Sequence, residues 1–313
     1  MNNLVVSIIV PCFNEQEVIT TTLEKISNIL MLTDFSFELV VVNDGSRDST
    51  RDEILKFKEL NPKLKVVIVN LRRNYGHMTA IQAGYEHSSG DLLITIDADL
   101  QDPPEIIPDM IGKHLEMGAD VVQAVRISRT KDTIFKRLTA YLYYKLVKKM
   151  TNLNVIMQAA DYRLITKDAV QEVLNLPESQ KVMRLLVPYM GFNVATVEFQ
   201  RQSRIAGKSK YTLSKMINLA IDSFLSFSNQ PLRLLSKYSL YMGIWSALLA
   251  LISIFLHFIL HTIPGWTSIV FLLLSGNALL IMSISLIGEY IGKIYVEILQ
   301  RPRYLVEKSS RFE

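Results

Sequence analysis

Residues 94–105 read ITIDADLQDPPE, a short apolar run that ends in three aspartates, a glutamine and two prolines. The run has the length and composition of a buried strand, and the prolines cannot continue such a strand. Burying charge is unfavourable unless a partner neutralises it. The stretch therefore predicts a strand whose carboxyl end faces a ligand.

The first part of the chain alternates strand-like segments with helix-like ones. Residues 15–30, 48–60 and 77–88 have the apolar spacing of helices. The strands that we expect lie at residues 5–10, 37–42, 65–70, 91–96 and 119–125. This alternation predicts an α/β fold with a mostly parallel sheet that is covered on both faces by helices.

Polar residues follow each of the first four expected strands. The four segments are PCFNE (11–15), NDGSRDST (43–50), LRRNYGH (71–77) and DADLQDPPE (97–105). In parallel sheets ligands bind at the carboxyl ends of the strands, so these segments are expected to line one site. The sequence contains neither GxGxxG after the first strand nor the P-loop pattern GxxxxGK[ST], which argues against ordinary dinucleotide-binding and P-loop proteins.

Asp97 and Asp99, at the end of the fourth expected strand, are candidate metal ligands. Two such carboxylates can hold Mg²⁺ or Mn²⁺ and leave positions open for water and substrate phosphates, and Gln101 can add an amide oxygen. The cation would neutralise charge on a diphosphate leaving group. Alternatively, the aspartates form a turn and cap the helix that begins at PPE.

Two further acidic residues are candidates for contacts with a nucleoside. Asp44 can accept a hydrogen bond from a base imide N–H, and Gly45 allows a tight turn beside it. Glu15 can accept a hydrogen bond from a ribose hydroxyl. However, DGS is also an ordinary turn signal, and Glu15 equally suits the N-terminus of the following helix, so both alternatives stay open.

The C-terminal part of the chain contains a long uncharged segment. Residues 238–288 include no Asp, Glu, Lys or Arg, which is enough for two membrane spans of about 20 residues each, with a turn at Pro264 and Gly265. The domains that we expect are a cytoplasmic domain at 1–235, two transmembrane helices within 236–292 and a cytoplasmic tail at 293–313. The alternative is a buried helical hairpin of a soluble protein.

Basic residues flank both expected spans, and the turn between them has none. Because cytoplasmic flanks carry the excess of Lys and Arg, we expect both termini on the cytoplasmic side of an inner or plasma membrane. The single cysteine, Cys12, excludes an internal disulfide and fits a reducing cytosol. Residues 126–149 carry eight basic residues and one acid, which indicates an amphipathic helix at an anionic membrane surface or else an ordinary solvated helix.

The ordered motifs resemble those of the family 2 glycosyltransferases, inverting enzymes with the GT-A fold. PCFNE, VNDGSRDST, NYGHMTAI and DADLQDPPE occur in that order and at these separations. ADYRL (160–164), RxxGxSKY (204–211) and the C-terminal spans ending in IGEYIGK are similar to polyprenyl-phosphate glycosyltransferases, the relatives of dolichol-phosphate mannose synthase and bacterial bactoprenol glucosyltransferases. The resemblance covers nearly the full chain and implies a Rossmann-like GT-A domain followed by a two-helix transmembrane hairpin.

The resemblance also implies site residues. The nucleotide-sugar site would comprise Pro11, Phe13, Glu15, Val42, Asp44, Asp97, Ala98, Asp99 and Arg126. Asp97, Asp99 and Gln101 would hold Mg²⁺ or Mn²⁺. Donor or lipid phosphates would contact Arg163, Arg201, Arg204 and Lys210. Arginine suits this task because its fork matches phosphate oxygens in pairs, although a solvated basic loop at 201–211 is the alternative.

Asp161 in ADYRL matches the position of the catalytic base in the resemblance, and Asp99 is the second catalytic candidate. A phosphomonoester acceptor, with a second pKa near ~6, is already largely ionised at neutral pH and needs little help from a base. Asp161 can instead orient Arg163 or the sugar, or form a structural ion pair. Whether His77, directly after NYG, affects the choice of donor stays open.

The implied function is metal-dependent, inverting transfer of a sugar from a nucleotide-diphosphate sugar to polyprenyl (undecaprenyl) phosphate at the cytoplasmic membrane face. Glucose and UDP are the expected sugar and nucleotide. The expected partners are this donor, the lipid, the bilayer and further copies of the chain, without nucleic acid. One alternative is a processive polysaccharide synthase, although the closest segment to its QxxRW motif, QPLRL (230–234), lacks Trp. The other is a non-catalytic membrane sensor of nucleotide sugars.

Overall fold

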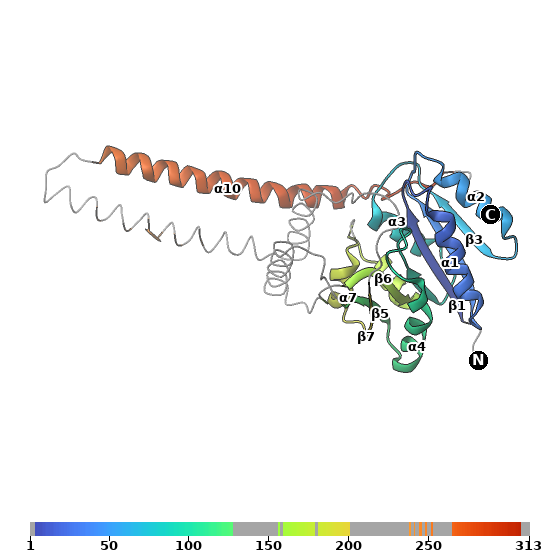
Figure 1. Cartoon of the computed structure of the whole chain (residues 1–313). Helices are drawn as coiled ribbons and strands as arrows, with labels where there is room; N and C mark the ends of the chain where they lie inside the picture. Colours follow the sequence, from blue (N-terminus) through green and yellow to red (C-terminus); the bar gives the residue numbers. More distant parts are fainter. Residues whose placement is uncertain are drawn as a thin grey trace. The chain divides into compact units, whose positions relative to one another are not determined.

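A computed structural model describes residues 4–127, 156, 159–178, 181–200, 238, 241, 244, 245, 248, 252 and 265–307 (Figure 1). The chain forms two units. One consists of Met1–Thr212 together with Arg301–Glu313, and the other of Leu213–Gln300. The first unit contains the sheet and the candidate site.

The sheet of the first unit has seven strands in the order β3-β2-β1-β4-β6-β5-β7. Their bounds are β1 (Val5–Cys12), β2 (Ser36–Asn43), β3 (Lys65–Asn70), β4 (Leu92–Thr95), β5 (Val121–Arg126), β6 (Ala159–Thr166) and β7 (Val194–Phe199). All neighbouring strands are parallel except β6, which runs antiparallel to both β4 and β5. The predicted mostly parallel α/β sheet is therefore confirmed.

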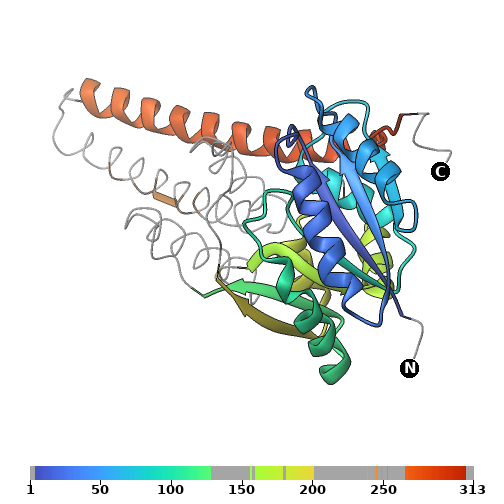
Figure 2. The same ribbon diagram turned by 45° about the vertical axis from the view of Figure 1, so that its right-hand side comes forward.

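Helices cover both faces of this sheet (Figures 1 and 2). Their bounds are α1 (Ile19–Met31), α2 (Thr50–Leu60), α3 (His77–Glu86), the 3₁₀ helix η1 (Pro104–Ile106), α4 (Ile107–Met117), α6 (Lys167–Leu174) and α7 (Met183–Met190). The apolar residues of α1, α2 and α4 share one core with alternate residues of β1, such as Val6 and Ile8. Because side chains alternate across a strand, Ile9 points to the opposite face, toward α3.

Helix α3 lies close against the sheet. A Cβ atom on Gly84 would lie 2.2 Å from Cγ2 of Ile9, so this close approach requires glycine. The packing fixes α3, and with it the position of His77 at the start of the helix.

The five strands expected from the sequence are all present, with ends that differ by one or two residues. For example, β1 extends to Cys12, and β4 ends at Thr95. The sequence did not predict β6 and β7, which lie in the region that showed little periodicity. Strand β6 carries Asp161 and Arg163 within an otherwise apolar run, and this charge conceals the pattern of a buried strand.

The second unit contains α10 (Trp266–Ile298). Within it, Ser275–Ile298 is long and apolar enough to cross a membrane, and it is the one such segment among the residues that the structure describes. The first expected span falls largely outside those residues, so the two-helix hairpin is not confirmed. The helix expected at 126–149 lies outside them from residue 128 on, and the basic loop at 201–211 lies outside them entirely.

Residues 301–307 belong to the unit that contains the sheet. The N–H of Arg72 donates to the carbonyl of Leu305, and the N–H of Glu307 donates to the carbonyl of Asn70, both at 2.9 Å. This C-terminal segment therefore pairs with the chain where β3 ends. Helix α10 itself runs to Ile298, beyond the boundary that we expected at residue 292.

Candidate functional site

The candidate site lies where β1 and β4 end, on either side of the point at which the chain order of the sheet reverses. Two non-glycine residues in the adjoining loops have left-handed backbone conformations, Asn14 with φ 53° and Leu100 with φ 55°. Such conformations are uncommon and persist where the surroundings enforce them. The N–H of Asn14 donates to Oγ of Ser46, and its side-chain oxygen accepts from the N–H of Arg47, which joins the loops after β1 and β2.

The acidic loop, residues 97–105, follows β4. Its backbone is anchored, because the carbonyl of buried Ala98 accepts a 2.7 Å hydrogen bond from the hydroxyl of Thr22. The carboxylate of Asp99 accepts from the N–H of Gln101 at 3.2 Å. Burial raises the pKa of Asp97 above its ordinary value, by more than the nearby His77 lowers it. Asp97 is thus a carboxylate whose charge the protein compensates only in part.

These side chains fit a divalent cation that is shared with a substrate. Among the described residues, no group of three or more His, Cys, Asp or Glu side chains is arranged to hold a metal ion. A preformed site enclosed by protein ligands is therefore absent from this part of the chain. Mg²⁺ is typically bound by one or two carboxylates together with substrate phosphates. Asp97 and Asp99 offer two carboxylates, and the charge of Asp97 is incompletely compensated.

Asp161 faces Asp97 from β6, at an irregularity in the sheet. Gln123 of β5 pairs with Arg163, and Val125 pairs with Ala159, so that three residues of β6 lie opposite the single residue Ala124. Such a bulge redirects side chains and is common beside functional sites.

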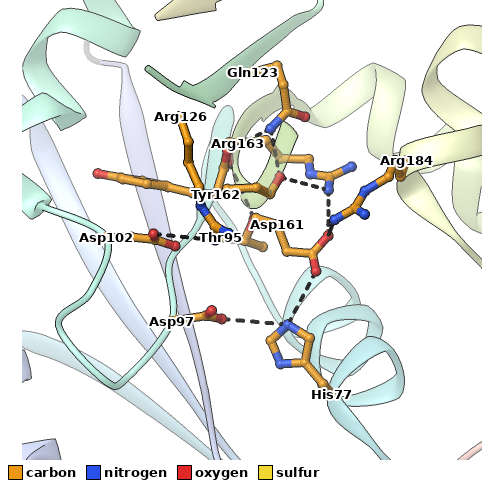
Figure 3. Close-up of polar contacts among 11 residues, drawn as sticks. His77, Thr95, Asp97, Asp102, Gln123, Arg126, Asp161, Tyr162, Arg163 and Arg184 are labelled. Carbon is orange, nitrogen blue, oxygen red and sulfur yellow. Dashed lines mark hydrogen bonds and ion pairs between the residues drawn. The ribbon is translucent and has the colours of Figure 1, made fainter. Parts of the chain in front are cut away.

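Two buried side chains stabilise this bulge (Figure 3). The side-chain amide of Gln123 donates to the carbonyls of Ala160 and Tyr162, at 2.7 and 3.0 Å. The hydroxyl of Thr95 donates to the carbonyl of Asp161 at 2.7 Å. Backbone groups that the bulge takes out of the ladder are thus satisfied, and the position of Asp161 is fixed.

Two arginines and a histidine surround Asp161. Nη2 of Arg163 lies 2.9 Å from Oδ1, Nη2 of Arg184 lies 4.0 Å from the same oxygen, and Nε2 of His77 lies 3.8 Å from Oδ2. Burial favours the neutral form of Asp161, but the charges of Arg163 and Arg184 outweigh it and hold its pKa below the ordinary value. Asp161 is therefore ionised at neutral pH, and it can orient these groups.

Arg163 is 2% exposed, and its guanidinium is directed at Asp161. This is the ion pair that the sequence left open. A contact between Arg163 and a phosphate stays a prediction.

Arg126, the last residue of β5, lies next to the acidic loop. Its Nη2 is 3.7 Å from Oδ1 of buried Asp102, and its charge lowers the pKa of both Asp97 and Asp161. The hydroxyl of Tyr162 donates to the carbonyl of Pro103 at 3.1 Å, which ties β6 to the same loop. Arg126, which the resemblance assigns to the nucleotide-sugar site, thus lies beside the acidic loop, and its contact with a ligand stays a prediction.

The expected nucleoside pocket is built on the ends of β1 and β2. Pro11 and Val42 are buried neighbours in the sheet, and Phe13 and Glu15 are partly exposed. The N–H of Glu15 donates to the hydroxyl of Thr50, and its carbonyl accepts from the first turn of α1.

Asp44 is 2% exposed, and both its carboxylate oxygens accept backbone N–H bonds, from Tyr75 at 2.7 Å and Gly76 at 2.9 Å. Burial raises its pKa by more than these bonds lower it. Beside it Gly45 has φ +66°, and a Cβ atom there would lie 2.3 Å from the backbone carbon of Arg73. Asp44 and Gly45 therefore hold the loop before α3 in place, and the bond from Asp44 to a base stays a prediction.

The structure brings together Asp97, Asp99, Gln101, Arg126, Asp161 and Arg163 from distant parts of the chain. Arg201, Arg204 and Lys210 lie outside the described residues. Arg184 was not among the expected residues, because no motif surrounds it in α7. His77 belongs to a polar segment that follows a strand, and this position in the sequence could have identified it as a site residue.

The sheet and its site define the class of the protein. The fold is GT-A-like: the glucosyl-3-phosphoglycerate synthase of Mycobacterium tuberculosis aligns with a TM-score of 0.52 at 19% identity, over 69% of this chain and 76% of the other. Residues 7–174 match Glycosyl transferase family 2.

Full-length relatives agree with this family. The chain is 36% identical over 307 residues to the bactoprenol glucosyl transferase of Shigella phage SfII, with 98% of each chain covered. It is 38% identical over 308 residues to the uncharacterized glycosyltransferase YkcC of Bacillus subtilis (strain 168), which covers 98% of this chain and 94% of the relative. The chain therefore belongs to glycosyl transferase family 2, and it is a glycosyltransferase.

Proposed function

We propose that this glycosyltransferase moves a sugar, with glucose expected, from a UDP-sugar to a polyprenyl phosphate at the cytoplasmic face of a membrane. The observation that carries the proposal is the placement of the acidic loop and the ionised Asp161 on either side of one gap. A donor phosphate group and an acceptor can meet there.

Relatives support the choice of substrates. Proteins that are 36% identical over nearly the full chain are named bactoprenol glucosyl transferase. One solved synthase with a similar fold was crystallised with Mn²⁺ and uridine diphosphate. A polyprenyl phosphate acceptor and a uridine nucleotide are the substrates consistent with both.

Asp97 and Asp99, with Gln101, are the residues that would hold a divalent cation, either Mg²⁺ or Mn²⁺. When bound, the cation supplies positive charge against the diphosphate leaving group. Arg126 lies beside the same loop and adds a fixed positive charge for phosphate.

In the proposed transfer, an oxygen of the lipid phosphate attacks the anomeric carbon of the sugar. The bond from that carbon to the diphosphate oxygen breaks, and UDP leaves with the electron pair. The configuration inverts because the attack comes from the face opposite the leaving group. The acceptor phosphate is already largely ionised near neutral pH and needs little help from a base. Asp161 then acts by orienting Arg163, Arg184 and the reactants.

The membrane supplies the acceptor. Ser275–Ile298 is a candidate span, and the apolar side chains of α10 are exposed over much of its length. The proposal also includes two membrane spans, cytoplasmic termini and an oligomeric assembly. It further includes phosphate contacts from Arg201, Arg204 and Lys210.

The test uses the full chain in vesicles that contain undecaprenyl phosphate. Radiolabelled UDP-glucose, UDP-N-acetylglucosamine and GDP-mannose are added in turn, with Mg²⁺, with Mn²⁺ or with a chelator. We expect label from a UDP-sugar in the chloroform-extractable lipid, and none after chelation. A water-soluble polymer would indicate a processive synthase, and binding without turnover would indicate a sensor. Either result contradicts the proposal.

A further inference from the structure

The side chain of His77 points from the first turn of α3 into the gap between Asp97 and Asp161 (Figure 3). Its Nε2 atom lies 3.5 Å from Oδ1 of Asp97 and 3.8 Å from Oδ2 of Asp161. The imidazole is 35% exposed, so it faces the open part of the site. It lies between the carboxylate of Asp97, in the loop proposed to bind the donor phosphates, and that of Asp161.

Neither distance is that of a hydrogen bond, because N–H···O bonds have lengths of about 2.7–3.2 Å. Within the described part of the chain, the ring contacts these two carboxylates at ion-pair distance and donates no hydrogen bond to either. Both neighbours are acceptors, so the tautomer that suits them carries its hydrogen on Nε2. The ring therefore presents an N–H group to the gap, and this group can donate a hydrogen bond to a ligand oxygen.

The backbone at His77 is fixed before any ligand arrives. The two N–H groups that precede it, those of Tyr75 and Gly76, donate to Asp44. Gly84 holds α3 against the sheet. A side chain on such a rigid support keeps its direction, which is what a specific contact requires.

We infer that His77 contacts the donor sugar and helps to determine which sugar is accepted. The inference rests on the proposed function. During transfer, the anomeric carbon lies between the leaving diphosphate, next to Asp97, and the attacking oxygen, next to Asp161. A group within 4 Å of both carboxylates lies alongside the sugar ring. The Nε2–H group donates to a hydroxyl of the ring, so the ligand class is a hexose with a hydroxyl at that position.

A donor aimed at one hydroxyl discriminates against sugars that lack it, because the polar group of the protein then loses its partner. The inferred contact of His77 is with the sugar ring and not with the uracil or ribose. Its removal should therefore change the recognition of the sugar and leave the affinity for free UDP as it was.

The experiment compares His77→Ala and His77→Gln with the unaltered full chain in vesicles that contain undecaprenyl phosphate. The matched control is His87→Ala, at the other end of α3, where the ring contacts the carbonyl of Ala83. KM and kcat are measured for the preferred UDP-sugar, its epimers and its monodeoxy analogues. The dissociation constant of UDP is measured separately by calorimetry.

For His77→Ala we expect kcat/KM for the preferred sugar to fall about 10- to 100-fold, the usual loss for one polar contact to a substrate. One deoxy analogue should lose less than about 3-fold, since it lacks the hydroxyl that His77 binds. UDP affinity should stay within about 2-fold, and Gln, which retains an N–H donor, should restore part of the loss.

An equal loss for all sugars, together with weaker binding of UDP, would show that His77 only supports the fold, and would overturn the inference. Unchanged kinetics in His77→Ala would overturn it as well. If the unaltered chain neither binds nor transfers any nucleotide sugar, the proposed function fails and this assignment fails with it. If the unaltered chain does transfer sugar, the proposed function holds, and a negative result for the His77 variants then counts against the role of His77 alone.

Discussion

The two ends of the mostly parallel sheet differ in how the protein surrounds a carboxylate. At the amino end, Glu38 of β2 is fully buried and accepts hydrogen bonds from the hydroxyl of Ser7, the N–H and hydroxyl of Ser89, and Nζ of Lys65, all between 2.6 and 2.8 Å. At the carboxyl end, Asp97 lies 3.5 Å from Nε2 of His77, which is longer than a hydrogen bond.

The pKa values differ accordingly. Although burial favours the neutral form, the bonds from Lys65, Ser7 and Ser89 lower the pKa of Glu38 from its ordinary 4.5 to about 2. Burial raises the pKa of Asp97 instead. A carboxylate with a complete set of partners within the chain stabilises the fold, whereas we propose that one with an incomplete set, such as Asp97, binds a ligand.

Removal of the acidic side chains from the carboxyl end should have the largest effect on activity. We expect Asp97→Ala and Asp99→Ala each to lower sugar transfer at least about 10³-fold, because charge on the leaving diphosphate loses its compensation. Thermal stability should be unchanged in Asp99→Ala and higher in Asp97→Ala, where a partly uncompensated and partly buried carboxylate is removed. Transfer of labelled sugar and a melting curve in detergent measure the two effects.

The matched control is Asp34→Ala, which removes an exposed carboxylate between α1 and β2 and should change neither quantity. Transfer of label into lipid by Asp99→Ala at the normal rate would contradict the assignment of this end to the donor.

At the amino end we expect the reverse pattern. The difference between pKa values of 4.5 and about 2 corresponds to about 3 kcal/mol of stability. Since the folded pKa is the lower one, this stability is fully present above pH 4.5 and is lost as the pH falls toward 2. Glu38→Gln should lower the stability at neutral pH by about 3 kcal/mol and remove this part of the acid dependence.

Melting temperatures between pH 2 and pH 7 measure this effect, and the transfer rate per folded molecule should stay normal. A Glu38→Gln protein that is as stable as the original but slower in transfer would mean that the two ends do not divide stability and function in this way.

The role of the carboxylates could be predicted from the sequence at the carboxyl end of the sheet but not at the amino end. The acidic loop was predictable because its carboxylates directly follow an apolar strand, and the same holds for the polar segments after β1, β2 and β3. The role of Glu38 was not predictable, since its partners Ser7, Lys65 and Ser89 come from three other segments. Within the strand, Glu38 is an ordinary polar residue near one end.

Strand β6 shows the same limit at the carboxyl end. Asp161 and Arg163 are tolerated in this strand because they form an ion pair with each other. Gln123 and Thr95 donate hydrogen bonds to backbone carbonyls of the bulge, and these contacts join residues that are far apart in the sequence. The local apolar periodicity of a sequence gives no information about partners that come from distant segments. The position of Asp161 in a motif was visible, but the bulge that directs it into the site was not.

The substitution Gly45→Ala tests whether the loop before α3, which Asp44 and Gly45 hold in place, positions the donor. In Gly45→Ala the new Cβ atom would meet the backbone of Arg73 at 2.3 Å, in a left-handed conformation that alanine disfavours. We expect the KM for the donor to rise about 10-fold and the stability to fall by about 2 kcal/mol. Gly112→Ala, in α4, is the matched control, because its Cβ atom would meet nothing within 4 Å. It should stabilise the helix by up to about 1 kcal/mol. Equal effects of the two substitutions would contradict a specific role for the loop.

Glu307 tests whether burial, and not pairing alone, determines how much a carboxylate contributes to stability. It forms a 3.0 Å ion pair with Arg51, but the side chains are 36% and 41% exposed. Ion pairs in such surroundings contribute about 0–1 kcal/mol, because water already stabilises both charges. Glu307→Gln should therefore change the stability by less than about 1 kcal/mol and the transfer rate by less than about 2-fold. A loss as large as that expected for Glu38→Gln would mean that pairing alone, without burial, sets the contribution of a carboxylate in this protein.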